Sequence, residues 1–262
     1  MARPFTSPQA ASLPQELDLG RACGATDIGL FRENNQDNFL VARERNLLMV
    51  ADGMGGHAAG EVASAAALEA VRQFMDALPV EAGESDAAMA ALEHALAFAN
   101  QRLYAENCAR GQADGSGMGT TLTGAWQAVP GGPLLAFHVG DSRLYRYRRG
   151  ELVQLTRDQS LYQQALDSGQ SGPLPPRNLL LQALGPAPEV VPELRAHLTA
   201  PGDLYLLCSD GLHGATADDV IAAILDGATR DGLPACCARL IGQAKRDGGR
   251  DNITVLLLQC RD

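Results

Sequence analysis

The stretch LLMVADGMGGHAAGE, from Leu47 to Glu61, decides the fold. Five apolar residues lead directly into Asp52, and glycines and alanines follow it. Such a run predicts a buried strand that ends on a carboxylate and is followed by a helix. Because burying a lone carboxylate costs free energy, Asp52 is expected to lie beside a charged partner or a metal ion.

Helical periodicity elsewhere predicts longer helices over about 61–78, 86–110, 216–226 and 233–245, with Thr216 as the expected N-cap of the third. Strand-like segments with short glycine-containing turns lie before, between and after these helix pairs. Since hairpins dominate, the sequence favours an α/β fold of the layered α+β kind, with antiparallel sheets, over a doubly wound parallel sheet.

The chain is expected to form one domain over residues 18–262. Residues 1–17 are rich in Pro, Ser and Ala and lack the apolar segment of a signal peptide, which indicates a flexible N-terminal arm. Residues 160–194 are rich in Gly, Pro and Gln and predict an irregular insertion with one or two short helical turns.

Composition excludes several classes of function. A net charge of −10 argues against a nucleic-acid partner. No apolar run approaches the roughly 20 residues needed to cross a bilayer, so no membrane association is expected. The six cysteines form no CxxC pair, which argues against a zinc ribbon and favours reduced thiols in the cytoplasm. A monomer is the expected state.

Five aspartates stand at the ends of apolar, strand-like segments: Asp37, Asp52, Asp141, Asp210 and Asp251. One such residue is ordinary in a turn, but five indicate a shared rim. Crowded carboxylates repel one another, and a divalent cation holds them ionised. With oxygen ligands and no Cys/His set, the pattern favours Mg²⁺ or Mn²⁺ over zinc.

Two further residues suit a hydrolytic site for phosphate esters. Gly53, directly after Asp52, has no side chain, so its carbonyl can approach a metal ion closely. Arg32 lies five residues before Asp37 and is the natural candidate to hold a phosphate with its guanidinium group.

These residues lie in motifs that resemble the bacterial form of the PPM/PP2C family of metal-dependent protein serine/threonine phosphatases. The resemblance covers about Thr26 to Leu258, and the motifs occur in family order. They are GLFRENNQDNF, VADGMGGHAAGEVAS, GMGTTLTGAW, FHVGDSRLYRYRRGELVQLTRD, RNLLLQALG, LLCSDGL and GGRDNITVLLL.

The resemblance implies a β-sandwich of two antiparallel sheets flanked by helices, with two Mn²⁺ or Mg²⁺ ions at one end. It implies hydrolysis of phosphoserine and phosphothreonine by a hydroxide that bridges the metals. The expected partners are phosphorylated proteins and a cognate Ser/Thr kinase that the enzyme opposes. The 160–194 insertion falls where bacterial members carry a mobile flap.

Site roles also follow from the resemblance. Asp52 would bridge the two metals, Asp210 and Asp251 would complete one of them, and the Gly53 carbonyl with Asp37 would serve the other. Asp141, together with Asp210, would serve a third, weaker metal site. Arg32 would hold the substrate phosphate.

Three departures from the family pattern bear on these roles. Gly214 stands where bacterial relatives often have an acidic residue, which puts the third metal site in question. The family's DHS reads DQS at residues 158–160, which bears on how the flap docks. Met54 stands where eukaryotic relatives have the proposed general acid, so His57 is the nearest candidate for that role.

A second function stays open on sequence grounds. A catalytically silent relative would bind a phosphoprotein or a kinase without hydrolysing phosphate. Loss of metal ligands would favour this alternative, whereas Asp52, Asp210 and Asp251 are all retained.

Overall fold

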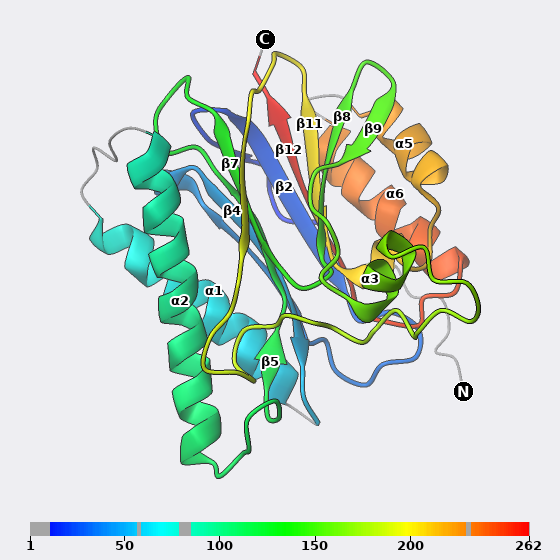
Figure 1. The fold of residues 1–262 in the computed structure, drawn as a ribbon. Helices are drawn as coiled ribbons and strands as arrows, with labels where there is room; N and C mark the ends of the chain where they lie inside the picture. The colour runs from blue at the N-terminus through cyan, green and yellow to red at the C-terminus, as the bar shows by residue number, and fades with distance from the viewer. Residues whose placement is uncertain (1–10, 57–58, 79–84, 229–231, 262) are drawn as a thin grey trace.

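The computed structural model describes residues 11–56, 59–78, 85–228 and 232–261. Two sheets pack face to face, and helices cover the outer face of each (Figure 1). This is the predicted layered fold, and every strand pairing is antiparallel among the described residues.

The first sheet has six strands. In spatial order they are β1 (Gln15–Glu16), β2 (Gly20–Asp27), β12 (Ile253–Cys260), β11 (Leu204–Cys208), β8 (Arg143–Arg148) and β9 (Glu151–Gln154). The short β1 lies within the predicted arm, so the last residues of that arm pair with β2.

The second sheet has five strands in its main path, and β5 (Gly119–Thr120) pairs with β4 beside it. In spatial order they are β10 (Glu193–His197), β7 (Leu134–Val139), β6 (Leu122–Trp126), β4 (Leu47–Met54) and β3 (Asp37–Ala42). A 3₁₀ turn, η1 (Arg43–Arg45), follows β3.

Long helices cover the sheets in two pairs (Figure 1). The second sheet carries α1 (Ala59–Ala77) and α2 (Ser85–Ala109), and the first carries α5 (Asp218–Asp226) and α6 (Leu233–Arg246). All four confirm the helices expected from periodicity. Among the described helices, none is long and apolar enough to span a bilayer.

One helix boundary was predicted wrongly. The N-cap of α5 is Ala217, not Thr216, and it makes no side-chain capping bond. The Thr216 hydroxyl instead donates to a carboxylate oxygen of Asp247, 2.9 Å away, and so ties the start of α5 to the end of α6.

Strand alternation divides the apolar residues into three cores. In β4, Leu47 and Met49 face α1 and α2, whereas Leu48 and Val50 face the opposite sheet. A third core lies between the first sheet and α5 and α6. Because both sheets are held rigidly by buried side chains, the loops at the strand ends are fixed relative to one another.

The 160–194 insertion contains one helix, α3 (Leu161–Asp167), with Ser160 as the N-cap of that helix. The last two residues of the insertion already belong to β10, a strand that the sequence did not indicate. In Figure 1 the insertion runs from α3 across the lower end of the sandwich toward β5.

Candidate metal and phosphate site

The five predicted aspartates come from both sheets and gather at one end of the sandwich. Asp37 begins β3 and lies directly opposite Asp52 of β4 in the strand register. Asp141 follows β7, Asp210 begins the short helix α4 (Asp210–His213) after β11, and Asp251 lies two residues before β12. The sandwich therefore delivers carboxylates from five chain segments to one place.

A cavity of about 280 Å³ opens at this end. Four of the five aspartates line it, together with Arg32 and Gly53, while Asp37 is buried beneath. The insertion contributes Asn178 and Leu180 to the wall. The full lining is Arg32, Gln36, Asp52, Gly53, Met54, Gly55, Thr121, Asp141, Asn178, Leu180, Asp210, Asp251 and Asn252.

Asp37 is fixed from below by neighbouring strands. The Ser209 hydroxyl donates to its Oδ2 at 2.6 Å, and Ser209 Oγ accepts from the amide of Thr254 at 3.0 Å. Its other oxygen, Oδ1, is buried and has no hydrogen-bond partner. An unpartnered buried carboxylate oxygen is costly, so Asp37 presents an open position for a further ligand.

The backbone of Asp52 is held by two threonines. Its carbonyl accepts from the Thr121 amide and from the Thr120 hydroxyl, each at 2.9 Å. Its amide donates to Thr121 Oγ1 at 3.0 Å. Since both backbone groups are satisfied, the position of Asp52 is set by β4 and by the Thr120 and Thr121 pair at the end of β5.

Two glycines allow the turn after Asp52 to pack against α1. A Cβ at Gly53 would lie 1.9 Å from the carbonyl oxygen of Gly60, and one at Gly60 would lie 2.7 Å from that of Gly53. A side chain at either position would therefore press on the other residue's carbonyl. The Gly53 carbonyl stays a predicted metal ligand.

The loop that carries Arg32 is anchored by Asn252. The side-chain nitrogen of Asn252, Nδ2, donates to the carbonyls of Ile28 and Asn34, each at 3.0 Å. Its Oδ1 accepts from the backbone amide of Gln36 at 2.8 Å. Asn252 is buried and adjoins Asp251, so one short segment supplies a carboxylate and positions the loop of Arg32.

Arg32 is half-exposed and bonds Asp251, with 2.5 Å between a guanidinium nitrogen and Oδ2. This contact, and the charges of Asp210 and Asp52 nearby, raise the pKa of Arg32. Its cationic group thus lies at the mouth of the carboxylate-lined cavity, where it can meet a phosphate.

Burial and mutual repulsion raise the pKa values of the clustered carboxyls. Burial, followed by the charge of Asp37, raises the pKa of Asp52 well above its usual value. Burial raises the pKa of Asp37 to about 7, against the Ser209 hydrogen bond. Burial and the charge of Asp251 raise the pKa of Asp210 to about 6. Burial and the charge of Asp210 raise the pKa of Asp141 to about 8.

The donor set fits divalent cations. Asp37 Oδ1 and Asp210 Oδ1 are both buried without a hydrogen-bond partner, and the surrounding donors are oxygens. Across the described ranges, no three acidic, His or Cys side chains meet closely enough to form a finished metal site.

The departures from the family pattern have structural counterparts. Gln159 donates its amide to the Gly140 carbonyl at 2.7 Å, and its Oε1 accepts from the Gly140 amide at 2.9 Å. This pair joins the start of the insertion to the loop of Asp141. A Cβ at Gly214 would lie 2.7 Å from the Asp210 carbonyl oxygen, so a side chain there would require a local shift. His57 lies outside the described residues.

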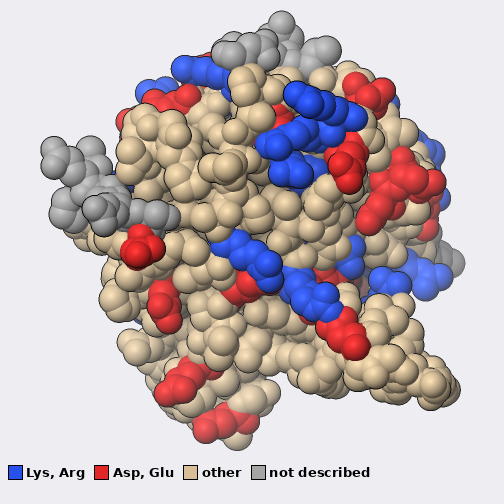
Figure 2. Space-filling view, turned by 45° about the horizontal axis from the view of Figure 1, so that its top comes forward, with Lys and Arg blue, Asp and Glu red and all other residues tan. Residues whose placement is uncertain are grey.

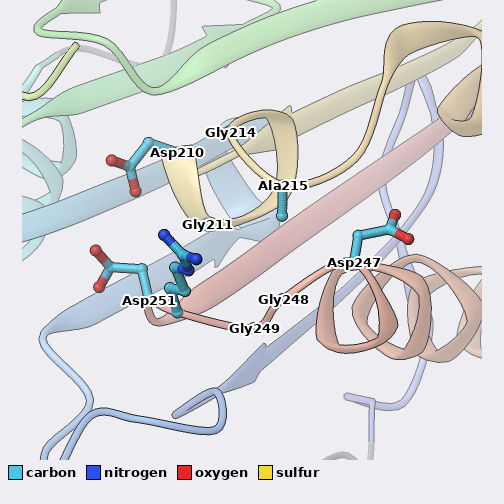
Figure 3. Close-up of a pocket in the computed structure, with 9 residues that line it drawn as sticks. Asp210, Gly211, Gly214, Ala215, Asp247, Gly248, Gly249 and Asp251 are labelled. Atoms are coloured by element: carbon cyan, nitrogen blue, oxygen red, sulfur yellow. The ribbon is translucent and has the colours of Figure 1, made fainter. Parts of the chain in front are cut away.

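A second cavity of about 330 Å³ adjoins the site (Figure 3). Asp210 and Asp251 lie at one end of it, with their carboxylates directed away from the labelled glycines, and Asp247 lies at the other end. Glycines line the stretch between them: Gly211, Gly214, Gly248 and Gly249.

The residues that support the site were not singled out from the sequence. Asn252, Ser209 and Thr121 hold Asp251, Asp37 and Asp52 or their loops in place. Asn252 and Ser209 each adjoin a predicted ligand in the chain, which is the one signal that could have found them. Thr121 becomes visible only when β4 is paired with its neighbours.

Known proteins resemble this chain over most of its length. A family model described as protein phosphatase 2C matches residues 32–233. The serine/threonine protein phosphatase PstP of Mycobacterium tuberculosis is 39% identical over 247 residues, which are 92% of this chain and 45% of the relative. The chain thus spans about half the length of that relative.

A second relative matches almost end to end. The serine/threonine phosphatase stp of Listeria welshimeri is 36% identical over 250 residues, which are 89% of this chain and 93% of the relative.

Crystal structures of PstP show the same fold. One, of the Mycobacterium tuberculosis protein, has a TM-score of 0.81 at 37% identity and covers 93% of this chain and 100% of that one. Another, of the catalytic domain in complex with two manganese ions, has a TM-score of 0.77 at 37% identity and covers 93% and 99%.

Proposed function

Because the chain belongs to the protein phosphatase 2C family, we propose that it hydrolyses phosphoserine and phosphothreonine in proteins with the help of two divalent cations. The observation that carries the proposal is the gathering of five aspartates from both sheets around one cavity with Arg32 at its mouth. The manganese-bound structure of the similar PstP supports the cations.

We propose that Asp52, Asp210 and Asp251, with Asp37 and the Gly53 carbonyl, hold two Mn²⁺ or Mg²⁺ ions. When bound, such ions neutralise the carboxylates, withdraw charge from phosphate oxygens and lower the pKa of a water nucleophile. Cation binding also displaces the protons that the raised pKa values retain, so affinity rises with pH.

Arg32 has the orienting role in this proposal. Its guanidinium group exchanges part of its contact with Asp251 for two phosphate oxygens and holds the ester in line for attack. Asn252 keeps the Arg32 loop in position, and Asn178 and Leu180 form the wall that limits water around the ester. His57 stays the candidate donor of a proton to the leaving alkoxide.

The test is phosphate release from a phosphothreonine peptide with Mn²⁺, with Mg²⁺ and with EDTA. We expect metal-dependent turnover that EDTA abolishes and added Mn²⁺ restores. Replacement of Arg32 by Ala should lower kcat/KM about ten- to a hundredfold, which corresponds to the free energy of a charge-assisted hydrogen bond. Arg32→Lys, which keeps the charge, should lower kcat/KM by less. Folded protein without turnover in either metal would favour the silent binding module.

Partners and location extend the proposal. We propose that the substrates are proteins phosphorylated by a cognate Ser/Thr kinase, and that the enzyme acts in the cytoplasm as a monomer. Release of phosphate from the kinase's own phosphorylated products tests the substrates, and light scattering tests the monomeric state.

A further inference from the structure

One face of this acidic protein is locally basic. Residues 143–198 carry seven arginines and five acidic residues, a net charge of +2, whereas the whole chain carries −10. Figure 2 shows Lys and Arg side chains on one face, in a group near the top of the view and in a band across its middle. Against so negative a background, a local excess of arginine indicates a surface that attracts anions.

Part of this positive charge lies on β10 and β8. The strand β10 is the edge of the second sheet, and β8 lies next to β9, the edge strand of the first sheet. Arg195 and His197 pair with Ala136 and Leu134, which face the opposite sheet, so both point the same way. Arg146 lies two residues from Leu144, which also faces that space.

These groups are close enough to affect one another. Burial lowers the pKa of His197, and the charges of Arg146 and Arg195 lower it further. Arg157 joins them from the segment after β9, because its amide donates to Glu193 of β10 at 3.2 Å. We call Arg146, Arg157 and Arg195, together with the uncharged His197 between them, the basic edge.

The basic edge is poorly neutralised by the protein itself. Among the described residues Arg146 forms no ion pair, and its Nε and the Nε2 of His197 are buried without a hydrogen-bond partner. The pairs of Arg195 with Glu193 and of Arg157 with Asp167 involve arginines that are more than half exposed. Exposed pairs contribute little and exchange readily for another anion.

Arg148 makes the contrast clear. It lies on the same strand as Arg146 but is held by the buried carboxylate of Asp203 through two contacts, of 2.5 and 2.6 Å. An arginine with such a partner is committed to the fold, whereas Arg146 is available to a ligand.

The basic edge leads to the active site. Two residues after Arg157, Gln159 binds both backbone groups of Gly140, which precedes Asp141. Along β7, Asp141 lies five residues beyond the partner of Arg195 and seven beyond that of His197. At about 3.3 Å per residue, these positions lie roughly 17 and 23 Å from Asp141.

We propose that the basic edge is a docking surface for an acidic segment of the phosphoprotein substrate, bound while the phosphorylated residue occupies the Asp52 cavity. The inference rests on the proposed function. Since an extended peptide spans about 3.3–3.6 Å per residue, the acidic residues should lie about five to seven residues from the phosphorylated one. The exposed Leu198 and Val191, at the two ends of β10, offer apolar contacts beside the charges.

Peptide turnover tests the proposal. The substrates are three kinds of phosphothreonine peptide. The first carries three Glu at positions five to seven from the phosphothreonine, on one side or the other. The second carries three Glu at positions one to three, and in the third Gln replaces every Glu. We expect the distant Glu block, on one side, to raise kcat/KM about five- to thirtyfold over Gln, as for two exposed ion pairs. The gain should fall at high salt.

Variants locate the effect. In Arg146→Gln/Arg195→Gln the preference for the distant Glu block should disappear, while turnover of p-nitrophenyl phosphate, which reaches only the cavity, stays at the wild-type level. Arg43→Gln is the control. Arg43 is exposed and follows β3, which is the edge of the second sheet opposite β10, so this variant should keep the preference.

Binding without catalysis separates this proposal from the proposed function. Fluorescence anisotropy of a labelled Glu-block peptide in EDTA should show binding that weakens in the double variant, even if wild-type protein hydrolyses nothing. Equal binding or turnover of Glu and Gln peptides by wild-type protein would overturn the docking surface, as would an unchanged preference in the double variant.

Discussion

Asn252 gives the sharpest separation of structural support from chemistry. Replacement by Ala removes three hydrogen bonds that tie the loop of Arg32 to the segment of Asp251. Each orphaned buried group costs about 1–3 kcal/mol. Because the loop reaches the surface and water can satisfy part of it, we expect a loss of about 2–4 kcal/mol, or about 5–15 °C in Tm.

Asn100 provides a matched control. Its amide nitrogen donates to the carbonyls of Ala187 and Pro188, at 3.0 and 3.2 Å, and its Oδ1 accepts from the Gly185 amide at 2.8 Å. It is as buried as Asn252, but it ties a different segment to α2. Asn100→Ala should therefore lose a similar amount of stability while Arg32 stays in place.

The assay compares Tm and the inhibition constant of inorganic phosphate for the two variants, at a temperature where both are folded. We expect Asn252→Ala to bind phosphate at least tenfold more weakly than wild type, and Asn100→Ala to bind within about twofold. Equal phosphate affinity in the two variants would refute the anchoring role of Asn252.

Three more predictions follow from the site. Gly53→Ala should abolish activity, since its Cβ would lie 1.9 Å from a carbonyl oxygen of α1, whereas Gly56→Ala, with nothing within 4 Å, should keep near-normal turnover and Tm. In EDTA, Tm should fall as pH rises from about 7 to 8, above the range in which the histidines with lowered pKa values oppose the trend. The folded state retains protons on Asp37 and Asp141, with pKa values of about 7 and 8, that the unfolded state releases near pH 4. A Tm that rises over this range would contradict those shifts. Asp210→Asn should remove turnover while the circular dichroism spectrum stays that of the wild type, and an active Asp210→Asn protein would remove Asp210 from the metal centre.

Much of the fold could be predicted because it depends on periodic burial. The apolar face of 61–78 and the strand before Asp52 are visible in the chain, and α1 and β4 confirm them. By contrast, β10 is a short edge strand whose sequence, ELRAH, alternates polar and apolar residues over only five positions, at the end of the Gly/Pro-rich insertion. So short an alternation is a weak local signal, and the non-local pairing with β7 decides its structure.

The candidate site divides in the same way. Aspartates at strand ends could be placed on a shared rim, and the structure brings all five to one end. That Asp37 lies opposite Asp52 depends on register, and the bond between Arg32 and Asp251 joins residues 219 positions apart. The Thr216 hydroxyl was expected to cap α5, but a tertiary partner, Asp247, competes for it.

Manganese binding tests most directly whether these aspartates form a metal centre. Isothermal titration of Mn²⁺ into metal-free wild-type protein and into Asp52→Asn is the measurement. We predict two ions bound per wild-type chain, with proton release, and loss of both from Asp52→Asn, because Asp52 is placed between them. Absence of binding to folded wild-type protein, or unchanged binding by Asp52→Asn, would contradict the metal centre and the hydrolysis that depends on it.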